Sequence, residues 1–190
     1  MGRPRKALAK RTASGGIQRD GIEKMKGAAA HVIDRRCAYL GWNSRDPERI
    51  KLARDQAGTV LDCLALHGVL THRAVAGINA YAATCERYRR AVGIPSPHAA
   101  SSQLGQGPQG QAPDDDDDDI QERARRAAAA YMAAVGAAQT IAPNATSVLN
   151  GITSRDFGSS IADDIAAIGS ARMVCIEQLG AALHEHFGLG

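Results

Sequence analysis

The sequence predicts an all-α fold, and three observations support this prediction. Alanine accounts for 36 of the 190 residues and favours helix, because it loses no side-chain entropy there. Apolar residues recur at helical spacing in long segments, and no segment shows the alternating pattern of a strand. Leu, Ile, Val and Phe total only 35 residues. We therefore expect helices with thin cores, which gain stability by packing against a copy of the chain or a partner.

The net charge of +3 conceals two oppositely charged halves. Residues 1–98 contain 18 Lys and Arg against 8 Asp and Glu, whereas residues 99–190 contain 5 against 12. Such an asymmetry suggests that the N-terminal half faces nucleic acid and that the C-terminal half has another role.

Residues 1–19 read as a disordered basic arm without apolar periodicity. The arm opens with Gly-Arg-Pro, the core of an AT-hook, whose arginines reach along the narrow minor groove of A·T-rich DNA. The alternative is a solvated tail that only aids solubility. If the arm contacts DNA, the candidate residues are Arg3, Arg5, Lys6, Lys10 and Arg11.

Residues 20–92 are expected to form a basic helical DNA-binding domain. A first helix is predicted from Asp20 to Leu40, where Ile33, Cys37 and other apolar residues share a face. A second helix follows an N-cap at Asp46 and a proline at the first helical position, and should continue to His67. A third helix should run to Val92.

The segment Gly68-Val69-Leu70-Thr71 predicts a tight turn, since glycine can end one helix and threonine can cap the next. The turn fits either a plain helical hairpin or a helix-turn-helix, which would bring His72, Arg73 and Asn79 near base edges. Arg87, Arg89 and Arg90 are further electrostatic candidates for DNA binding.

Residues 93–119 are predicted to be a flexible linker, rich in Pro, Gly, Ser and Gln and ending in six aspartates. Its match to G-x-G-x-x-G follows no strand and opens no helix, so it does not indicate a phosphate site. The aspartates 114–119 are either a solvated spacer or a competitor of DNA for the basic arm.

Residues 120–190 are expected to form a two-helix unit for oligomerisation or partner binding. One helix should run from Ile120 to Thr140, and a short irregular or helical piece should cover residues 144–158. The last helix should begin after a cap at Ser159 or Ser160. Its apolar stripe is the predicted oligomerisation surface and comprises Ile161, Ile165, Ile168, Leu179, Leu183 and Phe187.

Several classes of protein are not expected. The four cysteines are widely spaced and read as reduced core thiols. No signal peptide or membrane span is predicted, and no spacing of Cys and His suggests a metal site. We expect no cofactor and no catalysis, because the sequence has no nucleophile motif, no Walker A sequence and no carboxylates clustered on facing helices.

The N-terminal half resembles the small terminase subunits of tailed bacteriophages and prophages. The likeness lies in Gly2-Arg3-Pro4-Arg5-Lys6 and in the segment Leu64–Thr71, which continues through Tyr81 and Tyr88 toward Arg90. The resemblance implies a non-catalytic homo-oligomer in the cytoplasm of the bacterial host. It would recognise viral double-stranded DNA and regulate a large terminase subunit during genome packaging. Two alternatives remain: a structural or adaptor phage protein that assembles through its helices, and a helix-turn-helix regulator.

Overall fold

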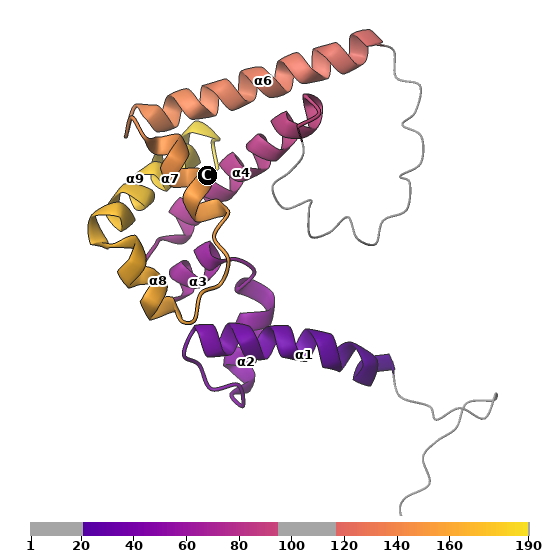
Figure 1. The fold of residues 1–190 in the computed structure, drawn as a ribbon, viewed down its shortest axis with the longest axis vertical. Coiled ribbons are helices and arrows are strands. Elements are labelled where there is room, and N and C mark those ends of the chain that lie inside the picture. Colours follow the sequence, from indigo (N-terminus) through magenta and orange to yellow (C-terminus); the bar gives the residue numbers. More distant parts are fainter. Residues whose placement is uncertain (1–20, 95–116, 190) are drawn as a thin grey trace, which may run out of the picture. The chain divides into compact units, whose positions relative to one another are not determined.

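The computed structural model describes residues 21–94 and 117–189, and every regular element within these ranges is a helix (Figure 1). The all-α prediction is therefore confirmed. The chain forms two compact units, Met1–Asp55 and Gln56–Gly190. The expected arm and residues 95–116 of the expected linker, 93–119, lie outside the described residues. The last three aspartates of that linker, 117–119, are instead the first turn of the helix Asp117–Gln139, which was expected to begin at Ile120. The second unit contains helices from both sides of that linker, so its boundary differs from the expected division into residues 20–92 and 120–190.

The first unit contains α1 (Gly21–Tyr39) and most of α2 (Pro47–Gln56). α1 agrees with the helix expected from Asp20, and it ends just before Gly41, whose φ is 67°. A guanidinium nitrogen of Arg36 donates a hydrogen bond of 3.2 Å to the carbonyl oxygen of Ala53, which ties α1 to α2.

The single helix predicted over residues 47–67 is wrong: α2 ends at Gln56, and α3 (Val60–Leu66) begins four residues later. A capping box causes the new start. The Asp62 amide donates to the Thr59 hydroxyl at 3.2 Å, and the Thr59 amide donates to the Asp62 carboxylate at 2.8 Å. These bonds satisfy backbone N–H donors at the start of α3. In a continuous helix, the same donors would bond to carbonyl oxygens of the preceding turn instead.

The predicted turn after the second helix is present between α3 and α4 (His72–Ala91). Gly68 has a φ of 75°, the left-handed conformation that glycine adopts without strain. The amides of Gly68 and Val69 donate to the carbonyls of Ala65 and Leu64, each at 2.9 Å. This is the paired hydrogen bonding of a Schellman motif, and it ends α3 sharply.

The second unit is organised around the crossing of α4 and α9 (Ser170–His186), its most extensive helix interface. α6 (Asp117–Gln139) lies beside the C-terminal half of α4 (Figure 1). The rings of Tyr88 and Tyr131 stack there, with their centroids 4.7 Å apart. The fully buried side chains in this unit include Leu64, Ile78, Tyr81, Leu149, Ile176, Leu179 and Leu183. The two halves of the sequence thus share one core.

The C-terminal region contains more helices than the two expected. The short piece after Pro143 forms α7 (Ala145–Thr153), and the predicted last helix is two helices, α8 (Ile161–Ile168) and α9. They meet at Gly169, whose φ is 80°, and their axes differ by 91°. The sharp bend needs a glycine because this positive φ is strained for other residues. The apolar stripe predicted along one helix is therefore bent at its middle.

Candidate nucleic-acid interface

Positive charge is concentrated in the first structural unit. Residues 1–55 contain 14 Lys and Arg against 6 Asp and Glu, a net charge of +8, and residues 56–190 contain 9 against 14, a net charge of −5. The net charges of the two units differ by 13, less than the 17 obtained by dividing the chain at residue 98, but the first unit carries its excess of positive charge on a shorter segment. A chain segment with this excess of cations attracts polyanions over the range of a Debye length.

The basic arm lies outside the described residues, so Arg3, Arg5, Lys6, Lys10 and Arg11 have no described geometry. Within the described part of the first unit, several arginines are paired with neighbouring carboxylates. Arg49 lies 3.4 Å from Asp46, and Arg54 lies 2.8 Å from Asp55. Both ion pairs are exposed, and the hydrogen bond from Arg54 lowers the pKa of Asp55. Exposed pairs of this kind are weak and can exchange for other anions.

The N-terminal turn of α4, which a helix-turn-helix would present to DNA, is occupied by carboxylates of α9. The Thr71 amide and hydroxyl donate to the Glu177 carboxylate at 3.0 and 2.6 Å. Arg73 forms an ion pair of 2.6 Å with Glu185. Two carboxylates beside this turn repel phosphate, so the surroundings of α4 do not favour a recognition helix at this position.

The remaining candidates on α4 lie at its surface. His72 and Asn79 are exposed, as are Arg87 and Arg90 near the end of the helix. Arg89 is more enclosed and forms an ion pair of 3.0 Å with Glu86. The structure therefore separates the candidates into two groups, one beside α9 and the other at the end of α4.

The arginines of α6 were not among the DNA-binding residues predicted from the sequence. Arg123, Arg125 and Arg126 are exposed, and their helix packs beside the C-terminal half of α4, which carries Arg87 and Arg90. A local signal existed, since these three arginines stand close together within an otherwise acidic half of the chain. Their proximity to α4 depends on tertiary packing and has no signature in the sequence.

The predicted oligomerisation stripe is partly used inside the chain. Ile161, Leu179 and Leu183 belong to the core of the second unit and are at most 4% exposed, so they are not available at a surface. Ile165, Ile168 and Phe187 keep intermediate exposure. The residues of the stripe would form one surface only along a continuous helix. The bend at Gly169 divides them between α8 and α9.

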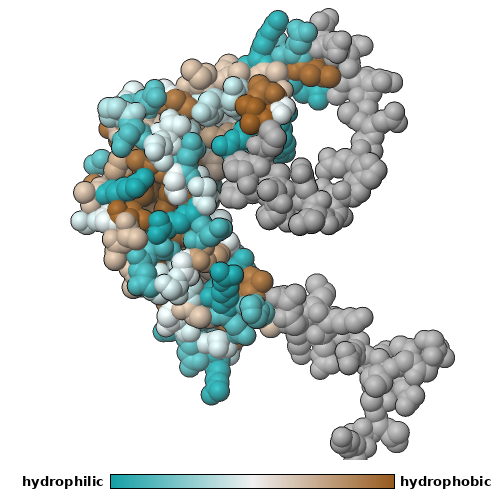
Figure 2. All heavy atoms as spheres, in the orientation of Figure 1, coloured by the Kyte–Doolittle hydropathy of each residue, from teal (hydrophilic) through white to brown (hydrophobic). Residues whose placement is uncertain are grey.

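An apolar groove of about 540 Å³ lies beside α9, lined in part by Val69, Ile165, Met173 and Val174. Val174 is 57% exposed, and Figure 2 shows apolar residues at the surface over α9 among hydrophilic neighbours. This groove contains one residue of the predicted oligomerisation stripe, Ile165.

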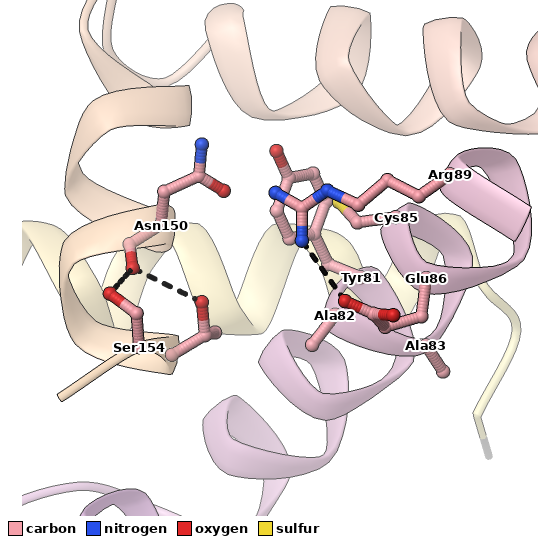
Figure 3. A pocket seen from close by; sticks show the side chains of 9 residues that line it. Tyr81, Ala82, Ala83, Cys85, Glu86, Arg89, Asn150 and Ser154 are labelled. Atoms are coloured by element: carbon pink, nitrogen blue, oxygen red, sulfur yellow. Dashed lines mark hydrogen bonds and ion pairs between the residues drawn. The ribbon is translucent and has the colours of Figure 1, made fainter. Parts of the chain in front are cut away.

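A second cavity, of about 350 Å³, lies between α4 and α7 (Figure 3). Glu86 and Arg89 form an ion pair on its α4 wall, and Asn150 faces them from α7. Burial raises the pKa of Tyr81 and of the Cys85 thiol, which also line the cavity. A raised pKa keeps the thiol protonated near neutral pH, so Cys85 is not an activated nucleophile.

The other cysteines are also thiols without disulfide partners: Cys37 and Cys63 are buried, and Cys175 is partly buried. Among the described residues, no group of three or more His, Cys, Asp or Glu could hold a metal ion. Within the same ranges, no single helix is long and apolar enough to cross a membrane; only the bent pair α8 and α9 reaches those limits, when the two helices are taken together.

Comparison of the chain with known proteins gives no significant match to a family model, to a curated protein or to a solved structure.

Proposed function

We propose that this chain is a non-catalytic, double-stranded DNA-binding protein that assists viral genome packaging in the manner of a small terminase subunit. The observation that carries the proposal is the separation of charge between the two structural units, +8 in residues 1–55 and −5 in residues 56–190. The basic unit would bind DNA, and the acidic unit would serve protein contacts. The opening Gly-Arg-Pro-Arg-Lys, which resembles that group of proteins, supports the packaging role.

The main DNA contacts are assigned to the arm. Arginine suits a narrow minor groove, where the negative potential is concentrated, and lysine neutralises phosphates as a point charge. Each phosphate contact releases counterions from DNA, so affinity should fall steeply as salt rises. The arm places five such residues, Arg3, Arg5, Lys6, Lys10 and Arg11, within eleven positions.

Two protein partners belong to the proposed function. A second copy of the chain is expected, because the cores are thin and the groove that contains Val174 is apolar. A large terminase subunit is expected from the resemblance alone, with the acidic second unit as its binding partner. The host cytoplasm is the place where such a complex would act.

Salt-dependent titration of the full chain with duplex DNA tests the proposal. The logarithm of the binding constant should fall with the logarithm of salt concentration, with a slope of about 0.9 per phosphate contact. Alanine at all five arm positions should reduce that slope by up to about 4. Binding that is insensitive to salt would refute the proposal. A chain that oligomerises, as measured by light scattering, but does not bind DNA would indicate the structural or adaptor role instead.

A further inference from the structure

The second unit carries a concentration of arginine that its net charge conceals. All nine of its basic residues are arginine, although its net charge is −5. Six of the nine are gathered on adjoining parts of two helices that pack together, three near the end of α4 and three in the first half of α6: Arg87, Arg89, Arg90, Arg123, Arg125 and Arg126. Residues more than thirty positions apart in sequence are thereby gathered at one end of the unit.

The Tyr88–Tyr131 stack fixes how these two helices lie. The rings are 4.7 Å apart and inclined by only 5°, so each tyrosine marks the side of its helix that faces the other. The two helices run in opposite directions, and the C-terminal end of α4 lies at the same end of the pair as the N-terminal end of α6 (Figure 1). The arginines on both helices are therefore neighbours along the pair.

Helical geometry places four of the arginines on one side of the helix pair, two of them at the flank and two farther round, toward the outer face of each helix. At about 100° per residue, Arg87 and Arg90 lie roughly 100° and 160° from Tyr88 in one sense of rotation. On α6, Arg123 and Arg126 lie roughly 80° and 140° from Tyr131 in the same sense. Because the helices are antiparallel, the same sense of rotation leads both pairs to the same side. Arg89 and Arg125 fall on the opposite side.

The described interactions of Arg126 and Arg87 are weak enough to exchange. Arg126 pairs with Glu122 at 2.8 Å, but their side chains are 77% and 48% exposed. Arg87 donates to the Thr84 hydroxyl and to a carbonyl of its own helix, each at 3.3 Å. Exposed pairs contribute little to stability, so a phosphate can replace them at small cost. The carboxylates of Asp119 and Glu122 lie at the same end and oppose the approach of phosphate, so each guanidinium group must contact its phosphate directly to bind it.

We propose that the flank formed by Arg87, Arg90, Arg123 and Arg126 is a second DNA contact surface that binds the phosphate backbone independently of the arm. The guanidinium group matches a phosphate with two parallel hydrogen bonds, which lysine cannot form, and the second unit uses arginine alone. A duplex offers phosphates continuously along both helices of the pair. This inference rests on the proposed DNA-binding function, which it extends from the arm to the second unit.

The test compares salt-dependent binding of a duplex of about 30 base pairs by the full chain and its variants. The triple variant Arg87→Ala/Arg90→Ala/Arg126→Ala should lower the slope by about 0.9 for each phosphate that is no longer neutralised. The triple Arg→Lys variant should retain most of the slope, since the charges remain, while binding more weakly than the wild type. The control is Arg172→Ala, which removes one exposed arginine from α9, outside the flank, and should leave the slope unchanged; the single variant Arg90→Ala, of the same charge change, should lower it.

The outcomes separate the two proposals. The flank proposal is supported if the triple alanine substitution lowers the slope both in the otherwise wild-type chain and in the chain that already carries the five arm substitutions. If the arm variant lowers the slope and the triple variant does not, the flank is overturned and the proposed function stands. If the wild type shows no salt-dependent binding, both proposals fail. An unchanged urea midpoint for each variant shows that the fold is intact.

Discussion

Gly77 of α4 and Gly180 of α9 lie against each other where the two helices cross. A Cβ atom added to Gly77 would clash with the Gly180 carbonyl and lie 2.6 Å from the His184 amide nitrogen. A Cβ atom added to Gly180 would lie 2.5 Å from the Ala74 carbonyl oxygen. The obstacles are backbone atoms, which cannot turn aside as a flexible side chain can. The closest helix contact in the second unit therefore depends on two glycines 103 positions apart.

Gly77→Ala or Gly180→Ala should destabilise the second unit, because the added methyl group forces α4 and α9 apart. Overpacking of this kind costs about 3 kcal/mol, and urea unfolding should show a lower midpoint. Gly136→Ala is the matched control. Gly136 is also a helical glycine, but a Cβ there meets nothing within 4 Å, so alanine should stabilise by about 0.5–1 kcal/mol. Equal effects at Gly77 and Gly136 would contradict the close crossing.

Some parts of the fold were predictable from the sequence, and others, such as this helix crossing, were not. Local signals identified the capped start of α4, the turn at Gly68 and the N-cap at Ser160. The break before α3 was missed because apolar residues keep helical spacing across it, although Thr59 and Asp62 have the spacing of a capping box. Gly169 was an isolated glycine in a periodic segment, which periodicity alone does not distinguish from a straight helix.

The candidate site was less predictable than the helices, for a physical reason. Counting charges along the sequence identifies a basic half that ends at residue 98. The count does not reveal that α4 packs against α9, which places α4 in the acidic second unit. The ion pair of Arg73 with Glu185 and the packing of α6 against α4 both depend on contacts between distant segments. Side-chain type and spacing show which residues could bind DNA; packing determines which of them share a surface.

Asp164→Ala should destabilise the second unit by about 2 kcal/mol. The Asp164 side chain is only 7% exposed and accepts two hydrogen bonds from Arg155, at 2.6 and 3.0 Å. Removing one partner of a fully buried pair costs about 3–5 kcal/mol, and the partial exposure of Arg155 reduces that cost. Glu122→Gln breaks the exposed pair with Arg126 and should cost less than about 0.5 kcal/mol. Urea unfolding measures both, and similar losses would argue against a special role for the buried pair.

Substitution at the start of α4 should leave DNA base preference unchanged. In a helix-turn-helix, His72→Ala and Asn79→Ala would relax base specificity, because these side chains would reach base edges. Here the adjacent Thr71 and Arg73 are bound to carboxylates of α9. Competition among duplexes of different sequence measures the preference. Loss of discrimination in either variant, with affinity for random duplex retained, would restore the helix-turn-helix interpretation.

Asp163 should titrate below its usual pKa, and two serines should contribute to this separately. The Ser159 and Ser160 hydroxyls donate to its carboxylate at 2.6 and 2.8 Å, and these bonds lower the pKa of Asp163 from 3.8. A pKa depressed by folding adds stability that is present above the unfolded value and is lost as pH falls through the folded value. NMR titration should show the Asp163 pKa rising in Ser159→Ala. Ser160→Ala should raise it too and also cost about 1 kcal/mol, because Ser160 accepts the Asp163 amide as the N-cap of α8. If Ser159→Ala left the titration of Asp163 unchanged, its hydroxyl would not be the donor that holds the carboxylate ionised.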